Sequence, residues 1–531
     1  MAGGSGVKDE DTGRGTGSSA PDSEHADSGE HGGLTGFFAA LQMTLGNPAS
    51  RLILKSMMKV EPDGRTSLDK ALAAYAGADT GPMSLSCSFQ SFMLDLLLKM
   101  GIAVTHADEE GVREMLRDPP VRRGIELVLK GIADYGITVP QEMPAPFLVV
   151  WNFTNMCNLR CKHCYQRADF PLPDELTLEE KLKVVAQLDR AGLAAIAFSG
   201  GEPLIHPHFM RVAGEAARRG MYVAVATNGI ALSNRSFVER MKRIGVRYVE
   251  VSIDSADPDR HDWFRGMKGA WNLSTRGLRN AVELGLSTAM ATTLTRMNVD
   301  EMDDILDLAE EIGVQRVIFF NFVPVGRGKD IVDMDLDPAE RERAMRKMFS
   351  EYKRRKLMVV STAPYYGRVS LQMSAGKEVA PTHFYVGGDS GITALADFVG
   401  GCGAGRIYAG IQPNGDLIPC VFLPIKVGNL REEAFWDIWT KAPLLRQLRD
   451  RGQLEGFCGQ CPYKYVCGGC RARAYGYTGN VMGPDPGCIY NTKVWRGIAE
   501  EMGVGADARQ RLAEELRELL ARAPQAASEG S

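Results

Sequence analysis

The sequence lacks the features that mark secreted, membrane-spanning or nucleic-acid-binding proteins. Its first thirty residues hold no apolar core segment, so we expect no signal peptide. The longest apolar stretch of the N-terminal region, residues 92–104, contains Asp95 and Lys99 and is too short to cross a bilayer. The 62 basic and 66 acidic residues give a net charge of −4 without a basic run, which argues against a polyanionic partner. We therefore expect a soluble, cytoplasmic protein with no transmembrane segment that binds no nucleic acid.

Cysteine is almost absent from the first 156 residues, where Cys87 stands alone, and the other ten cysteines cluster from Cys157 onward. Clustered thiols without a secretion signal indicate metal binding in a reducing compartment, and they argue against a disulfide framework. Cys87 is expected to be a buried thiol.

Three of the clustered thiols, Cys157, Cys161 and Cys164, follow an apolar run at residues 146–150. We expect a buried strand that ends in a tight loop gathering the three. Closed structural zinc sites use four ligands, whereas an iron–sulfur cubane held by three thiolates leaves one iron free for an exogenous molecule. The alternative is a zinc site completed by His163, although its position between two of the thiols makes it a poor ligand for the same metal.

From residue 147 onward, short β-rich runs alternate with amphipathic helices, which indicates an α/β fold of parallel βα units. We expect strands at 147–154, 194–199, 221–227, 247–253, 287–295 and 316–323, with helices near 177–191, 207–219, 235–243, 272–284 and 300–312. Ligands of such sheets bind at the C-terminal ends of the strands. Gly200, Gly201 and Glu202 follow the second expected strand; Ser252 ends the fourth and Arg265 comes after it.

Composition and periodicity divide the chain into six parts. We expect a disordered tail (1–33), a helical accessory domain (34–145), a domain of βα units (146–345), a connecting region (346–400), a cysteine-rich domain (401–495), and a helix near 507–522 with a tail (496–531). For the accessory domain the alternative is a peptide-docking or membrane-surface module, the latter suggested by Phe37, Phe38, Leu41 and Met43.

Seven cysteines lie in the C-terminal part: Cys402, Cys420, Cys458, Cys461, Cys467, Cys470 and Cys488. Between the first two, Asn414 and Gly415 predict the tip of a β-hairpin. CxxC pairs suit zinc as well as iron–sulfur clusters, so the spacing alone leaves both metals open.

The first cysteine loop, together with the Gly-Gly-Glu-Pro segment at residues 200–203, resembles the signature of the radical S-adenosylmethionine (SAM) superfamily. The resemblance implies a partial (β/α)6 barrel and a [4Fe–4S] cluster on Cys157, Cys161 and Cys164 whose free iron binds SAM. It implies that the reduced cluster cleaves SAM to methionine and a 5′-deoxyadenosyl radical, which takes hydrogen from an unactivated carbon. By resemblance, the amino group of SAM is bound by Gly200, Gly201 and Glu202, and its ribose and carboxylate by Ser252 and Arg265.

The C-terminal cysteines resemble the SPASM domain, a seven-cysteine module that holds two auxiliary [4Fe–4S] clusters in related enzymes. The resemblance implies one cluster on Cys458, Cys461, Cys467 and Cys488, and another on Cys402, Cys420 and Cys470. The second set lacks a fourth thiol, because residues 403–419 contain no cysteine. Two zinc sites are the alternative.

Members of the family with this architecture mature ribosomally made peptides or remodel tetrapyrrole side chains. Our first interpretation is an enzyme that modifies an unactivated C–H position in peptide, protein or cofactor maturation. The alternative is modification of a heme-precursor side chain, which the loop at residues 323–328 and the segment Cys467–Arg471 favour. An iron–sulfur electron carrier without SAM chemistry is a non-enzymatic alternative, disfavoured by the intact Gly-Gly-Glu segment. The implied partners are a peptide or small-molecule substrate and a low-potential electron donor of flavodoxin or ferredoxin type.

Overall fold

The computed structural model describes residues 42–43, 45–92, 94–95, 108–380, 386–387 and 392–503. The expected disordered tail, the helix expected near 507–522, and Phe37, Phe38 and Leu41 lie outside these ranges. None of the described helices is both long enough and apolar enough to cross a bilayer.

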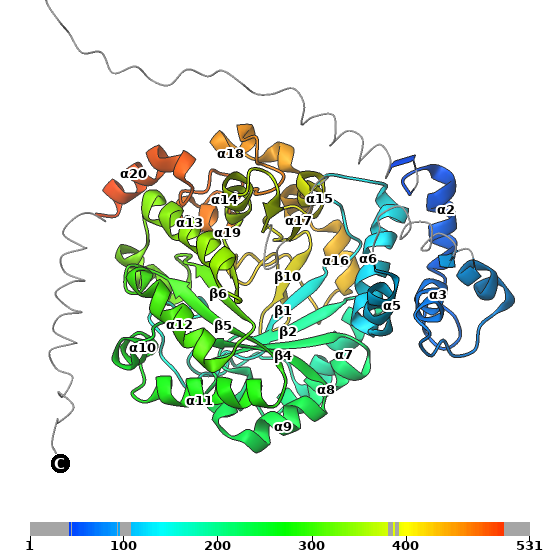
Figure 1. Ribbon diagram of the computed structural model, residues 1–531, viewed down its shortest axis with the longest axis horizontal. Coiled ribbons are helices and arrows are strands. Elements are labelled where there is room, and N and C mark those ends of the chain that lie inside the picture. The colour runs from blue at the N-terminus through cyan, green and yellow to red at the C-terminus, as the bar shows by residue number, and fades with distance from the viewer. Residues whose placement is uncertain are drawn as a thin grey trace, which may run out of the picture.

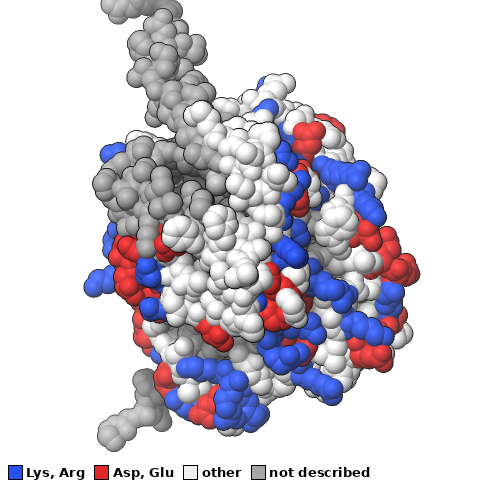
Figure 2. All heavy atoms as spheres, turned by 90° about the vertical axis from the view of Figure 1, so that its right-hand side faces the viewer, with Lys and Arg blue, Asp and Glu red and all other residues white. Residues whose placement is uncertain are grey.

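The N-terminal part is helical, as predicted, and lies at the right of Figure 1. It contains α2 (Pro48–Met57), α3 (Ser67–Tyr75), α5 (Glu109–Arg117) and α6 (Pro119–Tyr135). Its small core brings Leu68, Leu72 and Tyr75 of α3 against Met57 and Leu116. Cys87 is fully buried, as expected. Figure 2 shows the face that carries these helices, where positive and negative side chains are interspersed.

Helix α6 attaches the N-terminal part to the sheet. Its Leu127 belongs to the main hydrophobic core. Its Arg123 donates hydrogen bonds to the backbone oxygens of Leu193 (2.9 Å) and Arg219 (2.9 Å) and to the carboxylate of Asp189 (3.0 Å). These contacts lie between the sheet strands and the helices that follow them, so α6 is fixed to the outside of the sheet.

Six parallel strands form the centre of the molecule in chain order, which confirms the predicted βα succession. They are β1 (Leu148–Asn152), β2 (Ala195–Ser199), β3 (Tyr222–Thr227), β4 (Val246–Ser252), β5 (Ser287–Leu294) and β6 (Arg316–Asn321). The helices between them are α7 (Leu178–Arg190), α8 (Phe209–Arg218), α9 (Arg235–Arg243), α10 (Pro258–Arg265), α11 (Ala270–Glu283) and α12 (Met302–Ile312). Helix α7 begins with the capping box of Thr177 and Glu180, and α10 is a helix that periodicity did not reveal.

The sheet continues beyond the six predicted strands at both edges. Strand β7 (Met358–Ser361) pairs with β6, and β10 (Tyr408–Ile411) pairs in parallel with β1. Strands β11 (Asp416–Ile418) and β12 (Gly428–Asn429) follow antiparallel, and Asn414 and Gly415 form the predicted hairpin tip. The resulting sheet has ten strands in the order β12-β11-β10-β1-β2-β3-β4-β5-β6-β7. The cysteine-rich part therefore shares a sheet with the barrel, next to the strand that leads into the first cysteine loop.

The two faces of this sheet have different side chains. One face packs large apolar residues such as Trp151, Phe198 and Phe319 against the helices, which surround the sheet in Figure 1. The alternate positions form the inner face, which carries many alanines: Ala197, Ala224, Ala226, Ala289 and Ala291. Glu250 and Tyr248 of β4 lie on this inner face, and the Tyr248 hydroxyl donates to the Glu250 carboxylate at 3.3 Å. Burial raises the pKa of Glu250 to about 7.

The remaining helices and strands all follow β6 in the chain. They are α13 (Pro338–Arg354), α14 (Tyr366–Met373), β8 (Glu378–Val379), β9 (Val386–Gly387), α15 (Ile392–Val399), α16 (Phe435–Lys441), α17 (Pro443–Arg449), α18 (Gly456–Gln460), α19 (Arg471–Thr478) and α20 (Thr492–Glu501). Helix α13 begins with a capping box of Asp337 and Glu340.

Candidate functional site

The loop after β1 gathers its three thiols, as the apolar run before them predicts. Cys157, Cys161 and Cys164 belong to one small apolar cluster with Leu159 and Ala270. Burial raises the pKa of Cys157 to about 12, and the other two thiols act in the same direction. The three sulfurs are therefore close neighbours, and burial raises the pKa of Cys161 as well as that of Cys157.

The glycines after β2 lie directly against this loop. The Gly201 amide donates to the Thr154 carbonyl at 2.8 Å, and the Glu202 amide donates to the Met156 carbonyl at 2.8 Å. Gly200 has φ +112°, and a Cβ on it would lie 2.8 Å from the Thr154 oxygen. A Cβ on Gly201 would lie 2.1 Å from the Met156 oxygen. Close approach to the cysteine loop thus accounts for both glycines before any ligand is considered.

Glu202 is a buried carboxylate with three protein donors. It accepts hydrogen bonds from the backbone of Leu204 (3.0 Å) and Asn228 (2.8 Å) and from the hydroxyl of Thr227 (2.8 Å). Burial raises its pKa to about 7, although these donors favour the ionised form. Its negative charge also raises the pKa of Cys157, which places the carboxylate near the thiol set.

Arg265, at the end of α10, reaches the same thiols from the other side. Its Nε lies 2.7 Å from the Asp254 carboxylate, and its Nη1 lies 3.8 Å from the Cys161 sulfur. The backbone of α10 is fixed to the loop by hydrogen bonds from the Arg160 and Lys162 amides to the Arg265 and Phe264 oxygens. The sequence pattern singled out Arg265 but missed α10 as a helix and missed Asp254, which follows β4 and was detectable from the strand-end rule.

The side chain of His163 contacts an aromatic ring and a carboxylate. Its ring stacks on Phe264 at 4.4 Å, and its Nε2 lies 3.6 Å from the Asp254 carboxylate. Burial lowers its pKa to about 4. Within the described ranges, no group of three or more His, Cys, Asp or Glu side chains is arranged to hold a single metal ion.

Ser252 is half-buried at the C-terminal end of β4, opposite Ala291 of β5 in the register. It therefore lies on the inner face, at the edge of the sheet to which Glu202 and Asp254 also belong. Asn298, beyond the end of β5, donates to the backbone oxygens of Asp254 (2.7 Å) and Thr293 (3.0 Å). Its amide holds two strand ends together.

Arg327 has a role that the sequence did not indicate. Its guanidinium donates to the backbone oxygens of Cys161 (2.8 Å) and Ala168 (3.1 Å), and its amide donates to the Cys164 oxygen (2.8 Å). The loop after β6, which leads into the 3-10 segment η4 (Gly326–Met334), thus clamps the cysteine loop.

The C-terminal cysteines fall into two groups in space. Cys458, Cys461, Cys467 and Cys488 line one cavity, together with Gly468 and Gly469. Two N–H groups point at thiols there: the Asp485 amide donates to Cys458 at 3.4 Å and the Gly469 amide to Cys467 at 3.3 Å. These four are the set that the SPASM resemblance implies for one cluster.

Cys402, Cys420 and Cys470 form the second group. Burial raises the pKa of Cys420 to about 12, and Cys402 acts in the same direction, while burial and the neighbouring Asp485, Cys402 and Cys420 raise the pKa of Cys470. The Cys402 amide donates to the Cys467 oxygen at 2.9 Å, so the two groups adjoin. Three sets of thiols with N–H donors and no carboxylate ligand are a donor set suited to iron–sulfur clusters.

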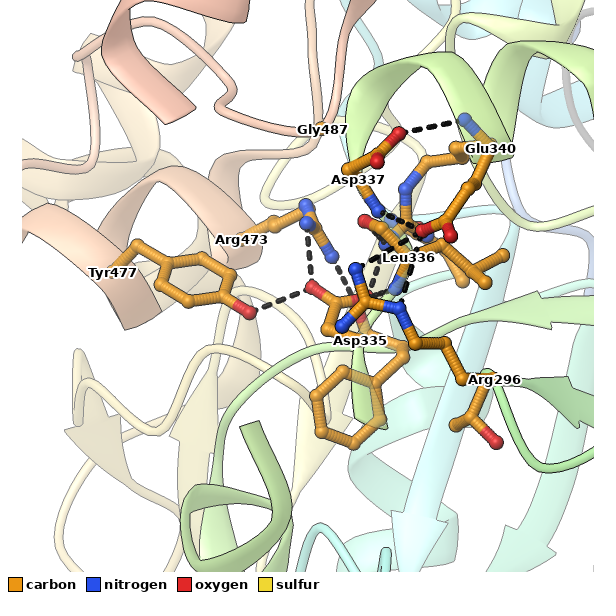
Figure 3. Close-up of polar contacts among 12 residues, drawn as sticks. Arg296, Asp335, Leu336, Asp337, Glu340, Arg473, Tyr477 and Gly487 are labelled. Carbon is orange, nitrogen blue, oxygen red and sulfur yellow. Dashed lines mark hydrogen bonds and ion pairs between the residues drawn. The ribbon is translucent and has the colours of Figure 1, made fainter. Parts of the chain in front are cut away.

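A buried ionic network joins the cysteine-rich part to the barrel. In Figure 3, Arg473 and Tyr477 of α19 point at Asp335, with contacts of 2.6 Å each to one carboxylate oxygen. Arg473 also donates to the Phe322 oxygen at 2.7 Å, beyond the end of β6. Burial alone would raise the pKa of Asp335, but Arg341 and Arg473 hold it below its ordinary value. No sequence pattern indicated this network, because its members are far apart in the chain.

Comparison with family descriptions gives two matches. The radical SAM superfamily matches residues 151–309, and the iron–sulfur cluster-binding domain SPASM matches residues 402–462. The match positions contain the first cysteine loop and the start of the C-terminal cysteine sets.

Curated relatives match about two thirds of the chain. The chain is 35% identical to the AdoMet-dependent heme synthase of Methanosarcina barkeri over 348 residues, which cover 65% of this chain and 97% of that protein. It is 32% identical to the Fe-coproporphyrin III synthase of the same organism, and the match covers 66% of this chain and 91% of that protein. It is 30% identical to the mycofactocin maturase MftC of Mycobacterium ulcerans, covering 65% and 89%.

Among solved structures, Streptococcus suis SuiB bound to precursor peptide SuiA matches with a TM-score of 0.56. The match covers 78% of this chain and 91% of SuiB at 15% sequence identity, so it supports the fold alone.

Proposed function

Because this chain belongs to the radical SAM superfamily and carries its SPASM iron–sulfur cluster-binding domain, we propose that it modifies a side chain of a tetrapyrrole, in the class of heme precursors. The observation that carries this proposal is the 35% identity to a heme synthase over 97% of that protein. The tetrapyrrole alternative from the sequence is thereby favoured over the peptide substrate that we placed first.

We assign the first cluster to Cys157, Cys161 and Cys164. When bound there, a reduced [4Fe–4S] cluster supplies the electron that splits SAM and releases the hydrogen-abstracting 5′-deoxyadenosyl radical. The chain's own residues would hold this site: Gly200 and Gly201 bring Glu202 against the cysteine loop, and the Glu202 carboxylate, which Thr227 and Asn228 hold in place, would accept N–H bonds from the amino group of SAM.

Arg265 and Ser252 complete the proposed SAM site. Asp254 fixes the Arg265 guanidinium through an ion pair of 2.7 Å, so that its other nitrogens face the thiols. Ser252 presents a hydroxyl at the same edge of the sheet, where it contacts the ribose or carboxylate of SAM. The cysteine loop, the clamp of Arg327 and α10 together keep this region packed, which limits water near a reactive carbon radical.

We assign two auxiliary [4Fe–4S] clusters to the C-terminal cysteines. Cys458, Cys461, Cys467 and Cys488 hold one, and Cys402, Cys420 and Cys470 hold the other through three thiolates. A low-potential flavodoxin or ferredoxin is the proposed electron donor to the first cluster.

The test is anaerobic incubation of the iron-reconstituted chain with SAM, dithionite and iron coproporphyrin III. We expect 5′-deoxyadenosine to form, and the tetrapyrrole to change mass. Cys161→Ala should abolish both signals, whereas Cys87→Ala, which removes a buried thiol far from the three cysteine sets in sequence, should keep them. Formation of 5′-deoxyadenosine without any change in the tetrapyrrole would contradict the substrate but not the SAM chemistry.

A peptide substrate is the second candidate, supported by the 30% identity to the mycofactocin maturase. It predicts that a precursor peptide, rather than a tetrapyrrole, stimulates 5′-deoxyadenosine formation and acquires the change in mass. Parallel incubations with each substrate class therefore separate the two proposals.

A further inference from the structure

Three fully buried arginines adjoin the C-terminal thiols and have no acidic partner. Arg406, Arg451 and Arg471 are 1%, 3% and 1% exposed. In the described part of the chain, none of them forms an ion pair with an aspartate or glutamate. Burying a charge costs free energy unless the charge is paired. Each of these guanidiniums is therefore expected to lie beside an anion.

Arg451 lies between the two cysteine sets. Its Nη2 donates to the Cys402 oxygen at 2.7 Å, and its Nε has no hydrogen-bond partner. Burial lowers its pKa, and the charges of Cys402, Cys467 and Cys458 act in the opposite direction. A Cβ on Gly468 would lie 2.3 Å from its Nη1. The glycine after Cys467 thus makes room for this guanidinium beside thiols of both sets.

Arg406 and Arg471 extend the same arrangement. Arg406 donates from Nη2 to the Val399 oxygen, while its Nε and Nη1 are buried without partners. The Cys402 thiol lies near enough to raise the pKa of Arg406 against the effect of burial. Arg471 donates from Nη1 to the Val481 (3.0 Å) and Gly483 (2.8 Å) oxygens, and its Nη2 is buried without a partner. Each guanidinium is held by carbonyl oxygens and retains unused N–H groups.

Other buried arginines of this region are paired, so the absence of partners is specific to these three. Arg473 lies 2.6 Å from Asp335, and Arg368 forms an ion pair with Glu342. Asp485 cannot serve as the missing anion, because its carboxylate already accepts from the Cys470 amide (2.7 Å) and the Gly487 amide (2.9 Å) and lies 3.5 Å from Arg473.

The first cysteine set has different surroundings. Two carboxylates, Glu202 and Asp254, act on its thiols, whereas Asp485 is the carboxylate that acts on the C-terminal thiols. Of the two guanidiniums beside the first set, Arg265 is paired with Asp254, and Arg327 donates to backbone oxygens. A four-thiolate cubane is a dianion when oxidised and gains another negative charge on reduction. Nearby positive charge therefore stabilises the reduced form, and nearby negative charge opposes it.

We propose that Arg406, Arg451 and Arg471 are the counter-charges of the auxiliary clusters and raise their reduction potentials above that of the cluster on Cys157, Cys161 and Cys164. This inference depends on the ligand assignment made under the proposed function. It makes the C-terminal clusters the better one-electron acceptors of the chain and assigns Arg451, which faces both sets, the largest effect.

The experiment is a potentiometric titration of the full-length, iron-reconstituted chain followed by electron paramagnetic resonance. A background in which Cys157, Cys161 and Cys164 are replaced by alanine leaves the auxiliary signals alone. In this background, Arg451→Gln should lower the ratio of reduced to oxidised cluster at a fixed potential at least tenfold, about 59 mV for a one-electron couple. Arg451→Lys, which keeps the charge, should restore the ratio to within about threefold of the parent, or about 30 mV by the same conversion.

The matched control is Arg446→Gln on α17, which removes an exposed arginine that donates to a backbone oxygen. It should leave the potential unchanged. An iron-replete Arg451→Gln chain with the parent potential would overturn the inference while leaving the cluster assignment standing. A parent chain without iron or without a reducible signal would overturn both. If Arg451→Gln loses iron while Arg451→Lys retains it, the counter-charge role is supported, and Arg406→Gln then measures the shift.

Discussion

Replacing Gly201 with alanine tests how the segment after β2 holds the cysteine loop. The new Cβ would lie 2.1 Å from the Met156 oxygen and 2.7 Å from its carbonyl carbon. Side-chain carbons do not approach other atoms within 3.0 Å, so one backbone must retreat by about 1 Å. Overpacking of this kind typically costs about 1–3 kcal/mol, and here it displaces the residue next to Cys157.

We expect Gly201→Ala to lower the iron bound at the first cysteine set, by up to about four irons per chain, and to lower 5′-deoxyadenosine formation in proportion. Iron analysis and chromatography of the SAM products measure the two effects. Gly214→Ala is the matched control, because its Cβ would lie 3.6 Å from Ile244, an ordinary contact, inside α8. Alanine there should be neutral or stabilise the helix by up to about 1 kcal/mol. A Gly201→Ala chain with full iron and normal SAM cleavage would refute the argument from close approach.

Three further perturbations test the surroundings of the site. Burial raises the pKa of Glu250 from its ordinary 4.5 to about 7, so ionisation of this carboxyl opposes folding as pH rises through that interval. Glu250→Gln should therefore raise the free energy of unfolding by up to about 3 kcal/mol at pH 8 and by less than about 1 kcal/mol at pH 5. Urea unfolding at the two pH values measures this difference. An equal gain at both pH values would contradict the burial of this carboxyl. Arg473→Met leaves Asp335 buried without that partner and should cost about 3–5 kcal/mol, seen as a lower thermal midpoint; an unchanged midpoint would exclude a structural role for the network. Arg327→Met removes charged hydrogen bonds worth about 1.5–3 kcal/mol each. It should speed hydrogen exchange of the backbone amides of the cysteine loop about tenfold or more. Arg167→Met, which breaks an exposed ion pair with Asp330, should change this exchange rate far less.

Periodicity in the sequence predicted the central architecture because each strand and helix of a βα unit is a local pattern. The six strands and the helices α7, α8, α9, α11 and α12 were found in this way, and the rule that ligands gather at strand ends selected the segment at 200–202. Helix α10 was missed because it is short and its apolar positions are few. The edge strands β7 and β10–β12 were not predicted as parts of one sheet, because strand pairing over long sequence separations leaves no local signal.

Side-chain partners were the least predictable feature. Arg327 binds carbonyls of a loop about 160 residues earlier in the chain, which no local pattern indicates. Asp254 was overlooked although it pairs with a predicted residue, Arg265. In each case the residue type was compatible with several roles, and only its neighbours in space distinguished them.

The sequence by itself determined the superfamily, the order of the βα units and the identity of the thiols, because these depend on spacing along the chain. The tertiary structure decided which thiols lie together, why two glycines follow β2, and which buried arginines have no carboxylate beside them. Those properties arise from packing between distant segments, where distances of a few ångströms and the exclusion of water set the charge that each site can carry.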